Sequence, residues 1–320
     1  MPEVKKKNIL SNIWQLLKKA SEEYIGDRAL KLGASLSYYT IFSLPPLLII
    51  IISICGFFFG AEAVKGEIYG QISHLVGKDS AIQIQEMIKN AALSKDGVLA
   101  TTIGIITLIF GASGVFGEIQ DSINLIWGIK AKPNRGLAKL IRNRLVSFSM
   151  IVVIGFLLLV SLVVNALIEI LNTKLQVIFP HTSVYIFYVV NLIILFAIIT
   201  LLFAIVFRTL PDGKVAWKDA LIGSLFTSFL FMIGKSAIGL YLGNSKIATT
   251  YGAAGSLIII LLWVYYSALI LYFGAEFTKV YSYTFGSKIT PNDYAVYIQT
   301  HEIEKETLQK SAEPKAELTG

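Results

Sequence analysis

Acidic residues inside apolar segments are the first feature of this sequence that could do chemistry. Glu118 and Asp121 follow a run of glycines in GASGVFGEIQDSINLIW, so a helix places both carboxylates on nearly the same face. Glu276 lies near the end of the apolar run YGAAGSLIIILLWVYYSALILYFGAEFTKVY. Placing such an acid in the membrane costs about 2 to 3 kcal/mol on insertion scales. We therefore expect it to have a partner or a task, such as binding a proton or a cation. A helix end touching water is the alternative, and it suits Asp121 better than Glu118.

Two basic residues lie at comparable positions. Arg208 ends one apolar segment, and Lys235 falls within another, in FLFMIGKSAIGLYLG. Helical side chains lean toward the N-terminus, so Lys235 leans into the bilayer and needs an internal acceptor. We predict Glu169 as that acceptor, with Asn165 as a second neighbour. A lysine facing a water-filled vestibule is the alternative.

Two adjacent prolines interrupt the apolar stretch SYYTIFSLPPLLIIIISICGFFF. Pro45 and Pro46 cannot donate to the helical ladder, and backbone groups at membrane depth must be paired within the protein. The pattern predicts a helix break there, with the helix restarting from a cap at Ser43 or Leu44. The peptide groups just before the prolines are then left for a ligand, water or neighbouring side chains.

These residues define one predicted site. The helix break, Glu118 and Glu276 belong to the same half of the membrane, and Tyr38 and Tyr39 add hydroxyl groups beside them. We predict a polar cavity that opens to the cytoplasm, where the two glutamates bind a cation or a proton. Arg208 pairs there with one glutamate or with an anionic substrate. Alternatively, the prolines kink a helix for packing and Arg208 anchors at the lipid headgroups.

The elements that position these residues are membrane spans. Of the 320 residues, 55% are hydrophobic and 15% charged, and mean hydropathy is +0.67. Soluble domains have about 45 to 50% apolar and about 25% charged residues. Windows of about 20 apolar residues predict an all-α polytopic membrane bundle with six spans. They cover approximately 33–59, 98–122, 145–170, 183–207, 215–242 and 253–281. The fifth could instead be an amphipathic surface helix.

The Lys and Arg residues predict the orientation, because they are retained on the cytoplasmic side of short loops. With the N-terminus inside, 21 of the 28 fall in inner segments, so both termini are predicted to be cytoplasmic. Three regions follow. They are a basic amphipathic segment at 1–32, a six-span domain at 33–283 with an outer loop at 61–97, and a polar cytoplasmic tail at 284–320. Composition predicts disorder in the tail.

Local patterns add detail to these regions. NILSNIWQLLKKA, at 8–20, predicts an interfacial helix on a leaflet of anionic lipids. DSAIQIQEMIKNAAL predicts a helix that rests on the outer surface, and its role in gating is left open. The stripe of Gly111, Gly114 and Gly117 predicts the close approach of another helix.

Other functional classes are disfavoured. Cys55 is the only cysteine, so neither a disulfide nor a cysteine metal site forms within one chain. His74, His181 and His301 fall in separate segments and cannot form a two-metal nuclease site. The sequence contains no P-loop, GxSxG elbow or RNA-stacking motif. We therefore expect no enzyme, metal, cofactor or nucleic-acid partner, and the basic excess lies beside membrane spans instead.

Four segments resemble hallmark segments of the YihY/virulence factor BrkB family of bacterial inner-membrane proteins, some of which have carried a ribonuclease label. They are SLSYYTIFSLPPLL, FGASGVFGEIQDSINLIW, RTLPDGKVAWKDALIGSLFTSFLFMIGKSAIGLYLG and YGAAGSLIIILLWVYYSALILYFGAEFTKVY. The resemblance covers about residues 25–285. It implies a six-helix protein of the bacterial inner membrane, often described as a transporter, with no defined catalytic set.

From these observations we expect a membrane transporter or flippase for a small solute or a lipid. A non-catalytic scaffold for envelope assembly, in which polar residues hold helices together, is the alternative. A membrane-bound hydrolase is disfavoured. The sequence leaves open the substrate, the coupling ion and association into a homo-oligomer.

Overall fold

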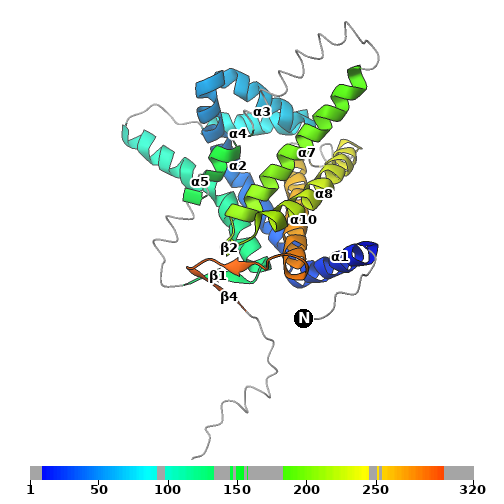
Figure 1. The fold of residues 1–320 in the computed structure, drawn as a ribbon. Helices are drawn as coiled ribbons and strands as arrows, with labels where there is room; N and C mark the ends of the chain where they lie inside the picture. The colour runs from blue at the N-terminus through cyan, green and yellow to red at the C-terminus, as the bar shows by residue number, and fades with distance from the viewer. Residues whose placement is uncertain are drawn as a thin grey trace, which may run out of the picture.

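The structure is a computed structural model that describes residues 9–91, 98–132, 145–146, 149–154, 157, 183–244, 251 and 254–298. Long helices dominate it, and very short strands join them at one end (Figure 1). The elements are α1 (Ile9–Gly26), α2 (Ala29–Phe59), α3 (Ala61–Val76), α4 (Lys78–Ala91), α5 (Val98–Ile126), β1 (Ile129–Ala131), α7 (Ser183–Thr209), β2 (Gly213–Lys214), α8 (Trp217–Asn244), α10 (Gly255–Thr284), β3 (Thr290–Pro291) and β4 (Ala295–Tyr297).

The predicted all-α membrane fold is confirmed. Four helices in the described ranges are long and apolar enough to cross a membrane: Ala29–Ser53, Val189–Thr209, Trp217–Tyr241 and Gly255–Thr284. They correspond to the first, fourth, fifth and sixth predicted spans. The second prediction falls on α5, and most of the third, 145–170, lies outside the described residues.

Helix α2 runs through Pro45 and Pro46 without ending. The predicted restart at Ser43 or Leu44 is therefore wrong. The fixed backbone angle of proline is compatible with a helix, so what is lost is the pair of N–H donors rather than the helical path.

The prolines instead contact α5 through the predicted glycine stripe. A Cβ placed on Gly111 would lie 2.9 Å from Cγ of Pro46, and one on Gly114 would lie 3.0 Å from Oγ of Ser43. At Gly117 the same test finds nothing within 4 Å. Two of the three glycines thus admit α2 at close range, which is how small residues act between membrane helices.

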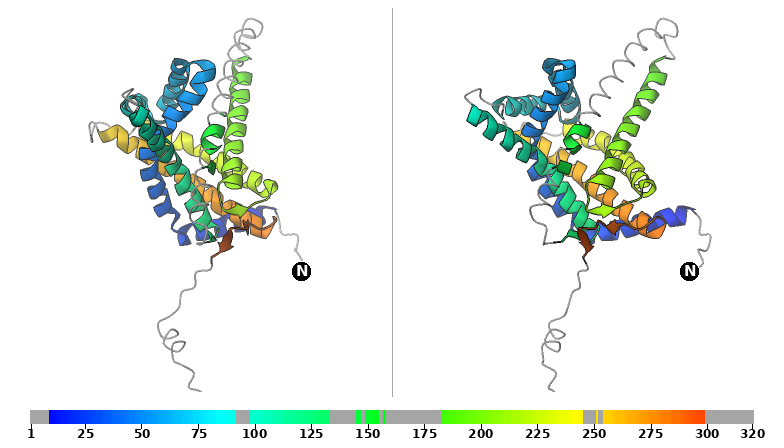
Figure 2. Two further views of the ribbon diagram at one scale, coloured as in Figure 1. Left: turned by 90° about the vertical axis from the view of Figure 1, so that its left-hand side faces the viewer. Right: turned by 60° about the vertical axis from the view of Figure 1, so that its left-hand side comes forward.

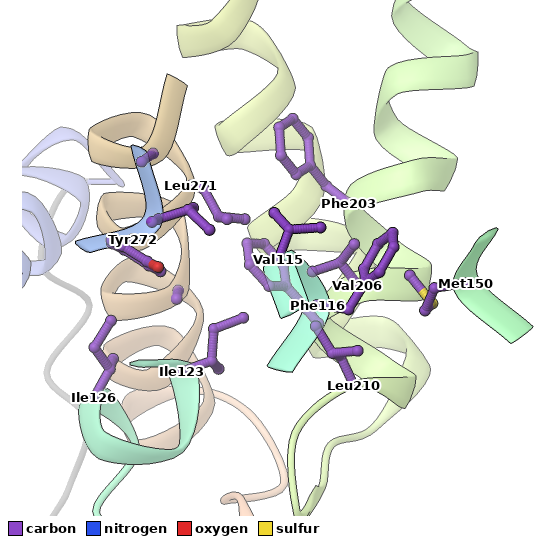
Figure 3. Close-up of a cluster of buried hydrophobic side chains, with 14 of the residues drawn as sticks. Val115, Phe116, Ile123, Ile126, Met150, Phe203, Val206, Leu210, Leu271 and Tyr272 are labelled. Carbon is purple, nitrogen blue, oxygen red and sulfur yellow. The ribbon is translucent and has the colours of Figure 1, made fainter. Parts of the chain in front are cut away.

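The main hydrophobic core lies between α5, α7 and α10 (Figure 3). Ile123 of α5, Phe207 of α7 and Tyr272 of α10 are fully buried in it. Helices α8 and α10 interlock beside this core, because Gly223 faces Thr278 and Gly274 faces Thr227. A Cβ on either glycine would overlap the opposing threonine, so the contact requires glycine.

Two ends of the bundle can be distinguished (Figures 1 and 2). The end that carries α1, the strands and the C-terminal part of α10 is called the α1 end here. The opposite end carries α3 and α4 and is called the hairpin end. The contrast matters for function because the charged cavity described below lies at the α1 end.

The chain after α10 is ordered further than predicted. Strand β4 pairs antiparallel with β1, and β3 pairs with β2. Ile289 and Ala295 are buried in the core. The expectation of disorder from 284 onward is therefore wrong for 285–298, while residues 299–320 lie outside the described part of the chain.

Both predicted amphipathic helices pack against the bundle. In α1, Leu16 and Ala20 are buried against Phe277 and Val280 of α10. In α4, the hydroxyl of Ser80 lies 3.5 Å from the carbonyl oxygen of residue 256 in α10, and α3 and α4 contact α2. Helix α4 is thus held by other helices rather than resting only on a surface.

Candidate functional site

Helix α1 brings two acids to the end of α10. The apolar contact made by Leu16 and Ala20 fixes the rotation of α1 on α10. Asp27 directly follows α1 and its backbone N–H donates to the carbonyl oxygen of Glu23 at 2.8 Å, so the two acids lie one helical turn apart on the same side. Lys279 of α10 meets both, with Nζ 2.7 Å from the carboxylate of Glu23 and 3.5 Å from that of Asp27.

Glu276 is a third acid beside Lys279, one turn earlier in α10. Its carboxylate lies 3.5 Å from Nζ of Lys279, and its side chain is 0% exposed. Neither carboxylate oxygen has a hydrogen-bond partner among the described residues. Three acids therefore share one ammonium group, which leaves Glu276 with a weak ion pair and no hydrogen bond in a buried position.

A large cavity opens at this end of the bundle. Its volume is about 1250 Å³, and it lies between the α1–α2 junction, the C-terminal half of α5, β1 and the end of α10. Its charged lining residues are Asp27, Arg28, Lys31, Glu118, Asp121, Lys130 and Lys279. Charges of both signs thus face the same space.

Residues 20–295 match the family described as virulence factor BrkB. The chain belongs to the virulence factor BrkB family. The matched range includes the helix ends and the acids and bases around the cavity. In the described part of this family member, no group of three or more His, Cys, Asp or Glu side chains could hold a metal ion.

Relatives of this BrkB-family chain include proteins named UPF0761 membrane proteins. One from Psychrobacter sp. is 26% identical over 269 residues, which cover 84% of this chain and 48% of that protein. One from Psychromonas ingrahamii is 29% identical over 244 residues, covering 76% of this chain and 79% of its own length. The chain therefore spans about half the length of the Psychrobacter relative. No solved structure matches it.

The structure brings some of the predicted site residues together. Glu118 and Asp121 both line the cavity, and Asp121 is exposed while Glu118 is half-buried. Glu276 does not line it but lies behind it, in contact with the lining residue Lys279. A binding role for these acids stays a prediction.

Tyr38 and Tyr39 lie outside the set of lining residues. The side chain of Tyr38 is 62% exposed and packs against Phe42, with ring centroids 5.0 Å apart. A Cβ on Gly114 would lie 4.0 Å from the ring of Tyr39. Ser35, by contrast, lines the cavity. Residues 38 and 39 lie about one helical turn beyond Ser35, so their side chains are about 5 to 6 Å further along α2 than the cavity wall.

Arg208 is engaged elsewhere, contrary to the predicted pairing with a glutamate. Its guanidinium donates a hydrogen bond to the carbonyl oxygen of Val215 and lies 5.7 Å from the ring centroid of Trp217. The turn between α7 and α8 folds back over the end of α7, so local partners reach Arg208 first. Arg208 therefore stabilises the turn between α7 and α8 and does not line the cavity.

Lys235 lies in α8 with a half-buried side chain. The adjacent Gly234 packs directly against Tyr266 of α10. The predicted partners Glu169 and Asn165 lie outside the described residues, so that pairing stays a prediction.

Asp212 is a buried acid that the sequence analysis missed. It is 1% exposed and accepts hydrogen bonds of 3.0 Å from the side-chain amides of Gln120 and Asn124. Its backbone N–H donates to Oδ1 of Asn124 at 2.7 Å. These bonds fix the α7–α8 turn to the part of α5 that carries the cavity acids, and Asn124 itself lines the cavity. The Pro-Asp-Gly sequence around Asp212 indicates a turn. The side chains that hydrogen-bond to Asp212 are distant in sequence, so the local pattern does not reveal them.

Asp219 makes a second anchor of the same kind. It is buried in the first turn of α8 and accepts hydrogen bonds from the Ser282 hydroxyl at 3.1 Å and the Ser287 N–H at 2.9 Å. Gly286 packs against the same carboxylate so closely that a Cβ would overlap it. The α1 end is therefore tied together by buried polar contacts among α5, α8 and α10.

Electrostatic effects outside the spans follow from these contacts. Burial raises the pKa of Tyr24 in α1 to about 12, with further contributions from Tyr265 and Glu276. The neutral Tyr24 hydroxyl donates to the carbonyl oxygen of Leu269 at 3.3 Å. At the surface, a hydrogen bond from Lys214 lowers the pKa of Asp293. Helix α1 is thus bound to α10 by apolar, ionic and hydroxyl contacts.

Proposed function

We propose that this membrane protein is a transporter or flippase for a small solute or a lipid, and that the cavity at the α1 end is its vestibule on the cytoplasmic side. The proposal places the chain in the bacterial inner membrane as a multi-pass protein with both termini in the cytoplasm. The single observation that carries it is the cavity of about 1250 Å³ with charged residues of both signs in its lining.

The size and lining of the cavity support this proposal. Sites for small ligands usually measure about 300 to 1,000 Å³, so the space exceeds what one compact solute needs. Ionisable side chains near membrane depth are costly and usually mark a substrate or ion pathway. Glu118 and Asp121 supply carboxylates, and Arg28 and Lys31 supply cations on the opposite element. A ligand with polar or charged groups would therefore find partners for either sign.

Glu276 adds a proton or cation step to this proposal. Its carboxylate shares Lys279 with Glu23 and Asp27, so protonation of one acid removes a competitor for the lysine and reduces the repulsion among the acids. Lys279 also lines the cavity. A change of charge at Glu276 would thus alter the field at the cavity wall without a direct contact to substrate.

A scaffold without transport is the second candidate, and the buried anchors of Asp212 and Asp219 favour it. Both carboxylates are satisfied by neighbouring elements and lie outside the cavity lining. In a scaffold, the acids near the cavity would serve the same purpose of holding helix ends. The two functions differ in what neutral substitutions do.

The test compares the variants Glu118→Gln and Glu276→Gln with Glu86→Gln. Glu86 is exposed in α4, so its substitution serves as a matched control. Uptake or flipping is measured in liposomes against a panel of labelled solutes and lipids, alongside complementation of a deletion strain. We expect both cavity variants to lose activity and keep the melting temperature, because glutamine preserves the shape and removes only the charge. Full activity in the Glu118→Gln/Glu276→Gln double variant would refute the proposal.

A further inference from the structure

A second cavity lies at the hairpin end, far from the site described above. It has a volume of about 410 Å³ and lies between α2, α3 and α4. Its wall is mainly aliphatic, formed by Ile52, Ile68, Ile72, Ala81, Ile84 and Ile88. An apolar space of this size is unsuited to water, which needs polar partners, and it falls within the usual range of about 300 to 1,000 Å³ for ligand sites.

The position of the cavity relates it to the edge of the membrane. Ile52 belongs to α2, an apolar helix long enough to cross a membrane, and lies seven residues before α2 ends at Phe59. The remaining wall comes from α3 and α4, which follow α2 in the chain. The cavity therefore lies beside the last two turns of a membrane-spanning helix, where lipid acyl chains are at hand.

The polar residues of the wall carry positive charge. Lys65, Tyr69, Gln85 and Lys89 complete the lining. Lys65 is ion-paired with Glu62 at 2.6 Å, whereas Lys89 has no acidic partner among the described residues. The ammonium group of Lys89 thus remains available to an anion that comes with an apolar chain, and long lysine side chains favour such interfacial positions.

We propose that this cavity binds one acyl chain of an anionic membrane phospholipid, with the headgroup at Lys89 and the chain among the isoleucines. The aliphatic wall matches the chain, and the lysines match the phosphate. The occupant is a phospholipid because the cavity lies at the edge of a membrane span, where phospholipid is the abundant apolar molecule. This site is independent of transport through the cavity at the α1 end.

The test uses the purified full chain and measures two quantities, the phospholipid retained in native mass spectra and the rise in melting temperature on addition of phosphatidylglycerol. Phosphatidylethanolamine and a free fatty acid are run in parallel. We expect phosphatidylglycerol to be retained and to raise the melting temperature more than either comparison. Equal shifts from all three, or a shift from the fatty acid alone, would overturn the proposal.

Two pairs of variants locate the site. Ala81→Leu fills the cavity and should abolish the lipid-induced shift, whereas Ile82→Leu on the exposed side of the same helix should retain it. Lys89→Glu should weaken binding of phosphatidylglycerol by about fivefold, as expected for one interfacial charge, and Lys78→Glu should not. A wild-type response in both Ala81→Leu and Lys89→Glu would overturn the proposal. If Ala81→Leu does not fold, the Lys89→Glu result decides.

Discussion

The two ends of the bundle differ in how closely their elements meet. At the α1 end and its supporting helices, a Cβ on Gly213, Gly223, Gly274 or Gly286 would overlap a neighbouring side chain, and open space is found at Gly26 and Gly117, which lie at or near the cavity. In and beside the hairpin formed by α3 and α4, a Cβ placed on Gly60, Gly66, Gly70 or Gly77 would have nothing within 4 Å. Tight packing transmits strain and fixes side chains in place. The α1 end is thus built to hold charged groups in fixed positions, whereas the hairpin leaves room for a flexible apolar chain.

The polar contacts follow the same division. Asp212 and Asp219 are buried and hydrogen-bonded at the α1 end. The ion pair between Glu62 and Lys65 in α3 is exposed, and such pairs contribute about 0 to 1 kcal/mol. Stability is therefore expected to depend on the α1 end and much less on the hairpin.

Loss of the buried Asp212 should have the largest effect. Asp212→Ala leaves the side-chain amides of Gln120 and Asn124 without their acceptor, at a cost of about 3 kcal/mol for two buried donors. Thermal unfolding of the purified protein measures the change. Asp293→Ala, which removes the exposed partner of Lys214, is the control and should leave the melting temperature unchanged. Equal effects of the two substitutions would break the comparison.

A methyl group at the α8–α10 contact should have the next largest effect. Gly223→Ala forces Thr278 aside and should destabilise the protein by about 2 kcal/mol through overpacking. Gly66→Ala in α3 meets no atom within 4 Å and should be neutral or stabilising, because alanine is the better helix former. Melting temperatures of the two variants are compared directly. A stable Gly223→Ala would show that the contact yields more easily than its geometry implies.

A smaller effect is expected from Tyr24, which ties α1 to α10. Its pKa is raised from 10.0 to about 12, so above pH 10 the unfolded chain loses this proton more readily than the folded chain. Stability contributed by the neutral hydroxyl is present below pH 10 and is lost between pH 10 and 12. Tyr24→Phe should therefore lose less stability over this interval than the wild type. Unfolding curves at several pH values test this, and parallel losses would contradict it.

The membrane spans could be predicted from the sequence because they rest on local composition. The prediction of 183–207 corresponds to α7 at Ser183–Thr209, and that of 253–281 corresponds to α10 at Gly255–Thr284. The glycine stripe likewise indicated a close helix contact, which occurs at Gly111 and Gly114. In these cases a run or a periodicity along one segment carries the information.

The candidate site could be predicted only in part, because its contacts join distant segments. Glu118 and Asp121 were identified as acids in a span, and both line the cavity. Lys279 was not singled out, since its role depends on Glu23 and Asp27, which lie more than 250 residues earlier. The ordered chain after α10 was missed because strands of two or three residues have too little periodicity to detect.

The most direct test of the central claim is side-specific labelling of the two ends. Single cysteines are introduced by Asp121→Cys and by Lys89→Cys in a Cys55→Ala background, which removes the natural cysteine. A membrane-impermeant maleimide is then applied to inside-out and right-side-out vesicles. We predict that Asp121→Cys reacts only in inside-out vesicles and Lys89→Cys only in right-side-out vesicles. Labelling of Asp121→Cys from the outer side, or its failure to react from either side, would contradict a charged vestibule that opens to the cytoplasm.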